Sequence, residues 1–118
     1  MRCRLRLVKS SSAIKRNNSD LCKVTEYHVG DKDIDFAIVE LSGRYPDSGL
    51  VTNQVSKEIV YIQQGQGKIV VDGIEHSLEA GDTVLVDAGE KFFWEGNMVL
   101  HIVCTPPFTV EQRMHLAA

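Results

Sequence analysis

Glu58 is the side chain in this sequence best suited to acid–base chemistry. It stands in the run KEIVYI, where Val60 and Ile62 share its parity, so a strand here would turn the carboxylate toward the protein interior. Burial among apolar side chains disfavours the charged form of a carboxyl group, which favours proton transfer near neutral pH. The alternative is a structural carboxylate, hydrogen-bonded to neighbours such as Gln54 or Tyr61. Glu58 is therefore a candidate for ligand binding or catalysis.

His101 is the most informative of the four histidines. It interrupts the apolar run VLHIVC, where on a strand it would share a face with Val99 and Val103. An imidazole facing Glu58 would form an acid–base pair, whereas a buried or interface imidazole would need only one hydrogen bond. No two histidines have the H-x-H spacing of a metal site. The three cysteines, at positions 3, 22 and 104, form neither a C-x-x-C pair nor a disulfide framework.

Aromatic and amide side chains complete a candidate pocket. KFFWEG places Phe92 and Trp94 on one strand face, as a stacking platform for a sugar or flat ring or as core side chains. The amides of Asn53 and Gln54 supply both hydrogen-bond donors and acceptors. The predicted ligand-binding residues are Asn53, Gln54, Glu58, Phe92, Trp94 and His101, with Glu58 and His101 as the catalytic candidates.

The elements that must position these residues are short β-strands. Apolar and polar residues alternate with a period of two, and turn signals recur about every 8–12 residues, as in sandwiches and barrels. In KIVVDGIEHSL, Asp72-Gly73 supplies the positive φ angles of a hairpin turn. After Pro106-Pro107, Thr109 and Gln112 have the spacing of a capping box, which predicts a short helix. We expect a loop at 10–20 and strands at 2–8, 22–28, 34–41, 51–56, 57–64, 67–72, 74–78, 82–86, 91–95 and 97–104.

Composition narrows the class of protein. With 118 residues, 43% of them hydrophobic and 25% charged, the chain is typical of one folded domain. Six of the 13 basic residues precede the first acidic residue, Asp20, so the body is acidic and would repel phosphate. We therefore predict no nucleic-acid binding. No stretch reaches the roughly 18 apolar residues of a membrane span, and the start lacks a signal-peptide core, so we expect a cytoplasmic protein.

Residues 58–89, EIVYIQQGQGKIVVDGIEHSLEAGDTVLVDAG, resemble the cupin superfamily of small β-barrels. Glu58 and Gly65 fit the end of the first cupin motif, G-x5-H-x-H-x3/4-E-x6-G, and Gly81 and Gly89 fit the second, G-x5-P-x-G-x2-H-x3-N. The resemblance covers about residues 43 to 108. It implies an all-β double-stranded β-helix, a jelly-roll barrel, with a short C-terminal helix. Over a single domain at 1–118, we expect a core barrel at about 34–105, N-terminal strands at 2–8 and 22–28, and a C-terminal tail at 106–118.

The positions that carry metal in this family differ here. The two histidine positions of the first motif hold Thr52 and Gln54, or Val51 and Asn53 in the other register, and the sequence does not decide which pair faces inward. In the second motif Phe92 stands for histidine, Asp87 for proline and Gly96 for asparagine. Of the four usual ligands only Glu58 remains, and one carboxylate with amides does not hold iron, manganese or zinc well. We therefore predict neither a metal nor another cofactor.

The interpretation we favour is a metal-free cupin barrel that binds a small polar metabolite, a sugar or a carboxylic acid, in its interior. One alternative is a metal-independent isomerase or epimerase that uses Glu58 and His101. A second is a dimeric structural or interaction module whose vestigial pocket is filled by Phe92. A third is a cupin enzyme with an atypical metal site built from Glu58, His101 and an amide. Small cupins commonly dimerise, so we expect a homodimer whose partners are small molecules, not nucleic acids or membranes.

Overall fold

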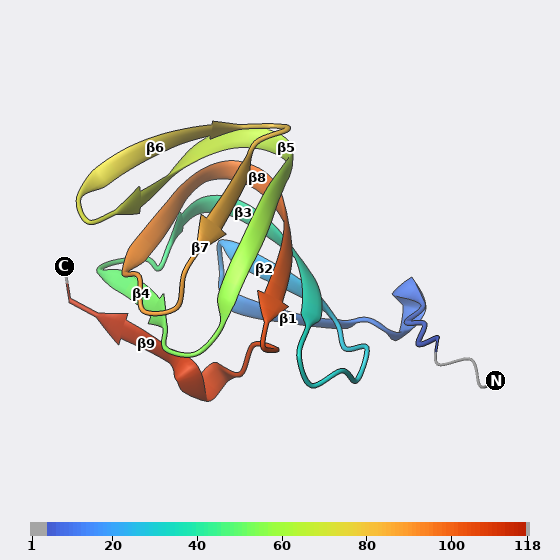
Figure 1. Cartoon of the computed structure of the whole chain (residues 1–118). Coiled ribbons are helices and arrows are strands. Elements are labelled where there is room, and N and C mark those ends of the chain that lie inside the picture. Colours follow the sequence, from blue (N-terminus) through green and yellow to red (C-terminus); the bar gives the residue numbers. More distant parts are fainter. Residues whose placement is uncertain (1–4, 118) are drawn as a thin grey trace.

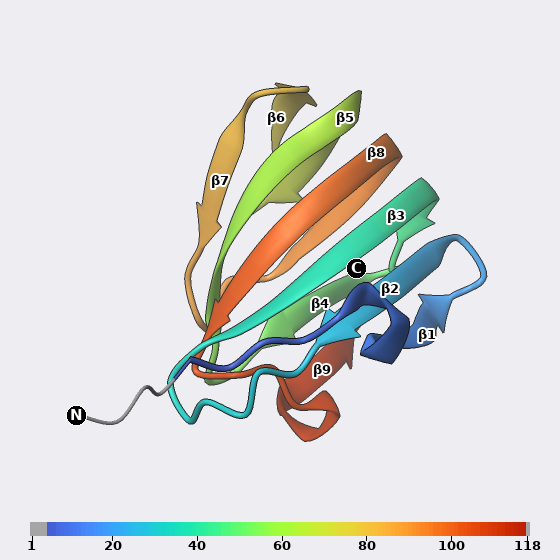
Figure 2. The ribbon, with the colours of Figure 1, turned by 90° about the vertical axis from the view of Figure 1, so that its right-hand side faces the viewer.

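A strongly curved antiparallel β-sheet makes up most of the protein. The computed structural model describes residues 5–117. Figure 1 shows β3, β5 and β8 curling round the interior, and the side view in Figure 2 shows β7, β5, β8, β3 and β2 in that order across one face. The all-β jelly-roll architecture expected from the sequence is therefore confirmed. The strands are β1 (Ile14–Ser19), β2 (Cys22–Tyr27), β3 (Asp35–Tyr45), β4 (Leu50–Asn53), β5 (Lys57–Val71), β6 (Ile74–Glu79), β7 (Thr83–Val86), β8 (Phe92–Thr105) and β9 (Arg113–Leu116), with 3-10 turns η1 (Ser10–Ser12) and η2 (Val110–Gln112).

Strands β5 and β8 pair along most of their length and form the main framework of the barrel. Each covers two of the predicted strands, since neither Gly65 nor Gly96 ends its strand. Gly67 and Gly96 lie opposite each other, and a Cβ atom on Gly96 would come within 2.5 Å of the Gly67 Cα. The two glycines therefore allow the long strands to approach closely where the sheet curls, and they do not form turns.

Alternation along these strands builds the core. On β5, Glu58, Val60 and Ile62 are buried while the residues between them are exposed. On β8 the even-numbered positions Phe92, Trp94, Met98, Leu100, Ile102 and Cys104 are buried. The inner face of the sheet is therefore apolar, with Glu58 as its buried acid.

The N-terminal region differs from the prediction. Of the strand expected at 2–8, residues 2–4 lie outside the described residues, and residues 5–8 form no strand. The loop expected at 10–20 contains β1, which pairs with β2 from Ile14 opposite Glu26 to Ser19 opposite Cys22. The polar residues of β1 lie on the last strand of the sheet, where few apolar positions reveal the period of two.

The C-terminal tail also differs, because the short helix is only a 3-10 turn followed by β9. Gln112 is buried, and its side-chain oxygen accepts hydrogen bonds from the backbone N–H groups of Ser56, at 2.6 Å, and Val55, at 3.1 Å. Strand β9 then pairs with β4. The Gln112 side chain therefore binds the segment between β4 and β5, and no side-chain cap forms at this turn. Within residues 5–117 no helix has the length and hydrophobicity that a membrane crossing requires.

Candidate binding site in the barrel interior

The inner face of the sheet encloses a cavity of about 60 Å³. A volume of this size holds a few water molecules, so a larger ligand requires some of the side chains that line the cavity to move. The apolar part of the lining includes Val24, Val39, Leu41, Phe92, Trp94, Leu100, Ile102 and Phe108. Its polar side chains include Arg16, Asn18, Glu26, Asp35, Tyr45, Glu58 and Arg113. The cavity thus combines an apolar wall with convergent polar groups, as small-molecule sites do.

Glu58 is the most buried acidic group of this cavity. It lies on β5, next to Cys104 of β8 and Val86 of β7, and is only 4% exposed. Its hydrogen-bonding side-chain partner is the thiol of Cys104, which donates to Oε2 at 3.4 Å. Burial raises the pKa of Glu58 above its ordinary value, and the positive charge of Arg113 and the Cys104 thiol oppose that rise. The neutral acid is therefore favoured, and it can donate as well as accept a hydrogen bond.

Arg113 is held in place by neutral groups. From β9 its Nε donates to Asn53 Oδ1 at 3.1 Å and its Nη1 donates to the Tyr45 hydroxyl at 3.1 Å. The guanidinium carbon lies 4.7 Å from the ring centroid of Phe108. Among the described residues no carboxylate forms an ion pair with Arg113. Because a guanidinium has five N–H donors, this cation keeps donors for a further partner.

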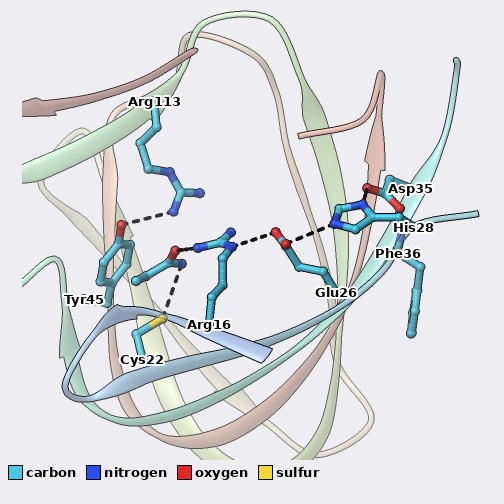
Figure 3. A network of polar contacts seen from close by, with 9 residues as sticks. Arg16, Cys22, Glu26, His28, Asp35, Phe36, Tyr45 and Arg113 are labelled. Carbon is cyan, nitrogen blue, oxygen red and sulfur yellow. Dashed lines mark hydrogen bonds and ion pairs between the residues drawn. The ribbon is translucent and has the colours of Figure 1, made fainter. Parts of the chain in front are cut away.

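A chain of polar contacts lies across the cavity from Arg113 (Figure 3). Arg16 Nε donates to Glu26 Oε2 at 2.7 Å, and Arg16 Nη1 donates to the side-chain oxygen of Asn18. The ring of His28 bridges Glu26, at 3.1 Å, and Asp35, at 3.2 Å. Arg16 is therefore paired with an acid, which Arg113 is not.

The structure brings three of the six predicted ligand-binding residues to the cavity wall: Glu58, Phe92 and Trp94. The rings of Phe92 and Trp94 are nearly perpendicular, with centroids 6.2 Å apart. Asn53 is buried and is connected to the site by the hydrogen bond that it accepts from Arg113. Gln54 is exposed, with its amide near Met114, so the register that turns Asn53 toward the site is the one present.

His101 is not part of this site. Its ring packs against Phe36 and Tyr61, with centroid distances of 5.9 Å and 6.3 Å, on the outer face of the sheet. Figure 3 likewise shows Phe36 pointing away from the polar network. The predicted pair of Glu58 with His101 therefore does not converge, because the two residues have opposite parity on adjacent strands and only the parity of Glu58 faces inward.

The donor set does not fit a cupin metal. Across residues 5–117 no three His, Cys, Asp or Glu side chains gather in a group that could hold a metal ion. Among these described residues the side chain that hydrogen-bonds to Glu58 is the thiol of Cys104, and the ring of Phe92 forms part of the cavity wall. A tight transition-metal site needs three or four such ligands.

Several site residues were missed from the sequence: Arg16, Asn18, Glu26, Tyr45 and Arg113. Arg113 lies in the tail, beyond the cupin motifs, and its place depends on the pairing of β9 with β4. For Arg16 a signal was available, because it shares parity with Asn18 and Ile14 on a strand. That signal is weak, since a polar run of this kind is also typical of loops.

Comparison with known proteins supports the same class. Residues 38–105 match the family of the cupin domain, so the chain belongs to the cupin family. Among solved structures, Pac13, described as a unique nucleoside dehydratase, is similar with a TM-score of 0.84 and 17% identity, covering 94% of this chain and 90% of that chain. A single-residue variant of Streptomyces PAC13 with uridine has a TM-score of 0.86 at 16% identity, covering 98% and 93%.

Two further solved structures, with lower TM-scores, have a similar fold. A sugar phosphate isomerase of the cupin superfamily from Silicibacter pomeroyi has a TM-score of 0.69 and 18% identity, covering 86% of this chain and 76% of that chain. KdgF from Halomonas sp. has a TM-score of 0.66 and 14% identity, covering 86% and 94%. At these identities the likeness concerns the fold alone. No curated protein matches the sequence.

Proposed function

We propose that this chain is a metal-free cupin that binds a small polar metabolite, a sugar or a carboxylic acid, inside its barrel. The observation that carries the proposal is Glu58, a carboxyl group 4% exposed whose hydrogen-bonding side-chain partner is one thiol. Burying an incompletely paired polar group lowers stability, and a ligand that hydrogen-bonds to the group offsets that cost. Arg113 supplies a cation and Phe92 and Trp94 an apolar wall beside it. Uridine and sugar phosphates, named for two structural relatives, are polar molecules of this kind.

The single tryptophan makes the proposal testable. Trp94 lines the cavity, so a ligand that enters it should change the tryptophan fluorescence and raise the melting temperature. We would titrate the protein with neutral sugars, uridine, and sugar and aromatic carboxylates, and repeat the titration with Glu58→Gln. Saturable binding by at least one class, weakened in the variant, is the expected result. If no compound changes either signal at millimolar concentration, the proposal is wrong.

The metal-free part of the proposal has its own measurement. Tag-free protein purified without chelator would be analysed for bound metal after exposure to iron, manganese, nickel and zinc. We expect no metal above background, because the donors beside Glu58 are too few. Near-stoichiometric metal that disappears in Glu58→Gln would contradict this part.

The isomerase alternative requires a second acid–base group beside Glu58, and His101 does not provide it. With His101 on the outer face, Glu58 has no imidazole with which to exchange protons across a bound molecule. We therefore propose binding as the function and keep no catalytic role for His101.

A second candidate, a dimeric module, is favoured by the outer face of the sheet. The outward side chains of adjacent strands form an apolar row: Leu85 on β7, Ile59 on β5, Val103 on β8, Phe36 on β3 and Tyr27 on β2. Leu85 is 57% and Ile59 49% exposed. A sheet that is apolar on both faces is typical of one that packs against another layer. We propose that a second copy of the chain covers this row, which is compatible with a ligand in the barrel.

The oligomeric state tests this second candidate. Sedimentation should give a dimer for the native chain and a monomer for Ile59→Glu, while Gln63→Glu, an exposed position on the same strand, should remain dimeric. A monomeric native chain would rule the dimer out. A dimer whose barrel binds no compound would favour the module with a vestigial pocket. The free thiols of Cys22 and Cys104 are consistent with a reducing compartment, so a cytoplasmic location belongs to the same proposal.

A further inference from the structure

The two arginines of the cavity differ in how their charge is balanced. Arg16 pairs directly with Glu26 at 2.7 Å. Within residues 5–117, the hydrogen bonds of the Arg113 side chain go to the neutral oxygens of Asn53 and Tyr45, and its guanidinium lies over the rings of Phe108 and Tyr45. A guanidinium that lines a cavity without a carboxylate contact is unusual, because its burial has a cost that an ion pair ordinarily offsets.

The neutral partners of Arg113 fix its orientation and leave its charge available. One N–H of Nη1 and the N–H of Nε are occupied, so the Nη2 group and the second N–H of Nη1 keep their donors. Neighbouring N–H donors of a planar guanidinium are the groups that bind the oxygens of a carboxylate or phosphate. Figure 3 shows the guanidinium reaching from its strand into the interior, apart from the contacts of Arg16.

The other charged groups of the cavity are already engaged. Glu26 binds Arg16 and His28, and Asp35 binds His28 and the backbone N–H of Phe36. Glu58 is deeply buried, and Cys104 is its hydrogen-bond donor. Arg113 is thus left without a counter-charge in contact, next to an apolar wall and a carboxyl group that can donate a hydrogen bond.

We infer that the ligand of this barrel carries an anionic oxygen group, a carboxylate or a phosphate, that binds the guanidinium of Arg113. The inference rests on the proposed function, since it names the class of metabolite that the barrel accepts. Between the sugar and the carboxylic acid left open by the sequence, it selects the anion: a sugar acid, a sugar phosphate or another small acid, but not a neutral sugar. The remainder of the ligand would then lie against Phe92 and Trp94, with its polar atoms toward Glu58.

A rival explanation is that Arg113 serves only to balance an ionised Glu58. The two explanations differ in what happens when Glu58 is replaced by an uncharged isostere. If Arg113 binds a ligand anion, the preference for anions is present in the native protein and persists in Glu58→Gln, because the guanidinium keeps its charge. If Arg113 only balances an ionised Glu58, the native protein shows no preference for anions, and a preference appears only in Glu58→Gln, where the guanidinium has lost its counter-charge.

The experiment compares matched anionic and neutral compounds at constant ionic strength. The pairs are glucuronate with glucose, glucose 6-phosphate with glucose, uridine 5′-monophosphate with uridine, and benzoate with benzamide. Trp94 fluorescence and the melting temperature report binding. We expect the anion of at least one pair to bind at least ten-fold more tightly than its neutral counterpart. Whether the carboxylate pairs or the phosphate pairs show this difference identifies the anionic group of the ligand.

Variants assign the preference to Arg113. Arg113→Gln should remove the preference, and Arg113→Lys, which keeps the charge but loses the planar fork, should retain part of it. Arg6→Gln removes the same charge from an exposed arginine paired with Asp31 and should change nothing. Far-ultraviolet circular dichroism checks that each variant is folded.

Each outcome has a separate meaning. Neutral compounds that bind as tightly as their anions, or a preference that survives in Arg113→Gln, would contradict the anion site and leave the proposed function standing. A preference that disappears in Glu58→Gln would also contradict it. No binding by any compound, anionic or neutral, would contradict the proposed function itself.

Discussion

The thiol of Cys104 donates a hydrogen bond to Oε2 of Glu58, at 3.4 Å, across the neighbouring strands β5 and β8. Both side chains are buried, and a thiol is a weak donor. A single weak donor does not replace the hydration that an ionised carboxylate loses on burial. Burial of this pair therefore raises the pKa of Glu58 and favours its neutral form, and the consequences for stability and reactivity can be measured.

Replacing Glu58 with glutamine should make stability less dependent on pH. The pKa of Glu58 is raised in the folded protein, chiefly by burial, from an ordinary value of 4.5. Below that value both states are protonated. As the pH rises above it, the unfolded chain releases the proton first, so the native protein loses stability by up to about 1.4 kcal/mol per pH unit until the folded pKa is passed.

Urea denaturation of both proteins between about pH 4 and pH 8 checks this prediction. The free energy of unfolding of Glu58→Gln should increase relative to the native protein as the pH rises. Glu111→Gln, at an exposed position, is the control and should show no such trend. A constant difference between Glu58→Gln and the native protein would mean that Glu58 ionises as freely in the barrel as in water.

The buried thiols should be unreactive in the folded protein. Burial raises the pKa of Cys104, the adjacent Glu58 raises it further, and burial also raises the pKa of Cys22. Because the thiolate is the reactive form, alkylation at about pH 8 should be at least about 100-fold slower than in urea. Cys3 lies outside the described residues, so the measurement uses Cys3→Ser, with labelled sites mapped by mass spectrometry. Rapid labelling of Cys104 without denaturant would show an open or activated site.

Periodicity predicted the barrel because its signal is local. Alternation along a strand and the cupin motifs depend on residues close in sequence, and they located Glu58, Phe92 and Trp94 on the strands that carry them. For His101 the same rule was indecisive, since Val99 and Val103 on one face are as apolar as Leu100 and Ile102 on the other. In the structure Leu100 and Ile102 face inward. Because the outer face of the strand is also apolar, the sequence pattern did not show on which face His101 lies.

Arg113 could not be located by local rules at all. Its position follows from the pairing of β9 with β4, in which Arg113 lies opposite Asn53, sixty residues earlier in the chain. The spacing of Thr109 and Gln112 is equally compatible with a helix N-terminus. Which structure forms depends on the buried partner of Gln112, and long-range contacts of this kind override local propensity.

Gln112 should be needed to hold the tail that carries Arg113. Its side-chain oxygen accepts from two backbone N–H groups, and its Nε2 donates to the Ser56 hydroxyl at 2.9 Å. Gln112→Ala would remove these hydrogen bonds and leave the buried backbone N–H of Ser56 without this partner, at a cost of about 2–3 kcal/mol in the free energy of unfolding. Gln63→Ala, at an exposed position, should cost less than about 0.5 kcal/mol. Equal effects in the two variants would show that the tail is not anchored through Gln112.

Gly96 should tolerate no side chain, because two strands approach each other there. A Cβ atom at Gly96 would lie 2.5 Å from the Gly67 Cα and 2.6 Å from the Gln66 carbonyl oxygen, both backbone atoms that can move only with the sheet. Gly81 also has a positive φ, of 97°, but a Cβ atom there would meet nothing within 4 Å. The pair therefore separates steric overlap from the cost of the backbone conformation, which is about 1 kcal/mol.

We expect Gly81→Ala to lower the free energy of unfolding by about 1 kcal/mol and Gly96→Ala by about 3 kcal/mol or more. Urea denaturation at neutral pH measures both. Trp94 lies two residues from Gly96, so its fluorescence in the folded variant also reports whether the inner wall of the cavity has shifted. Similar losses in the two variants would mean that the sheet can open at the crossing, and that the curvature of β5 and β8 does not depend on the contact between the glycines.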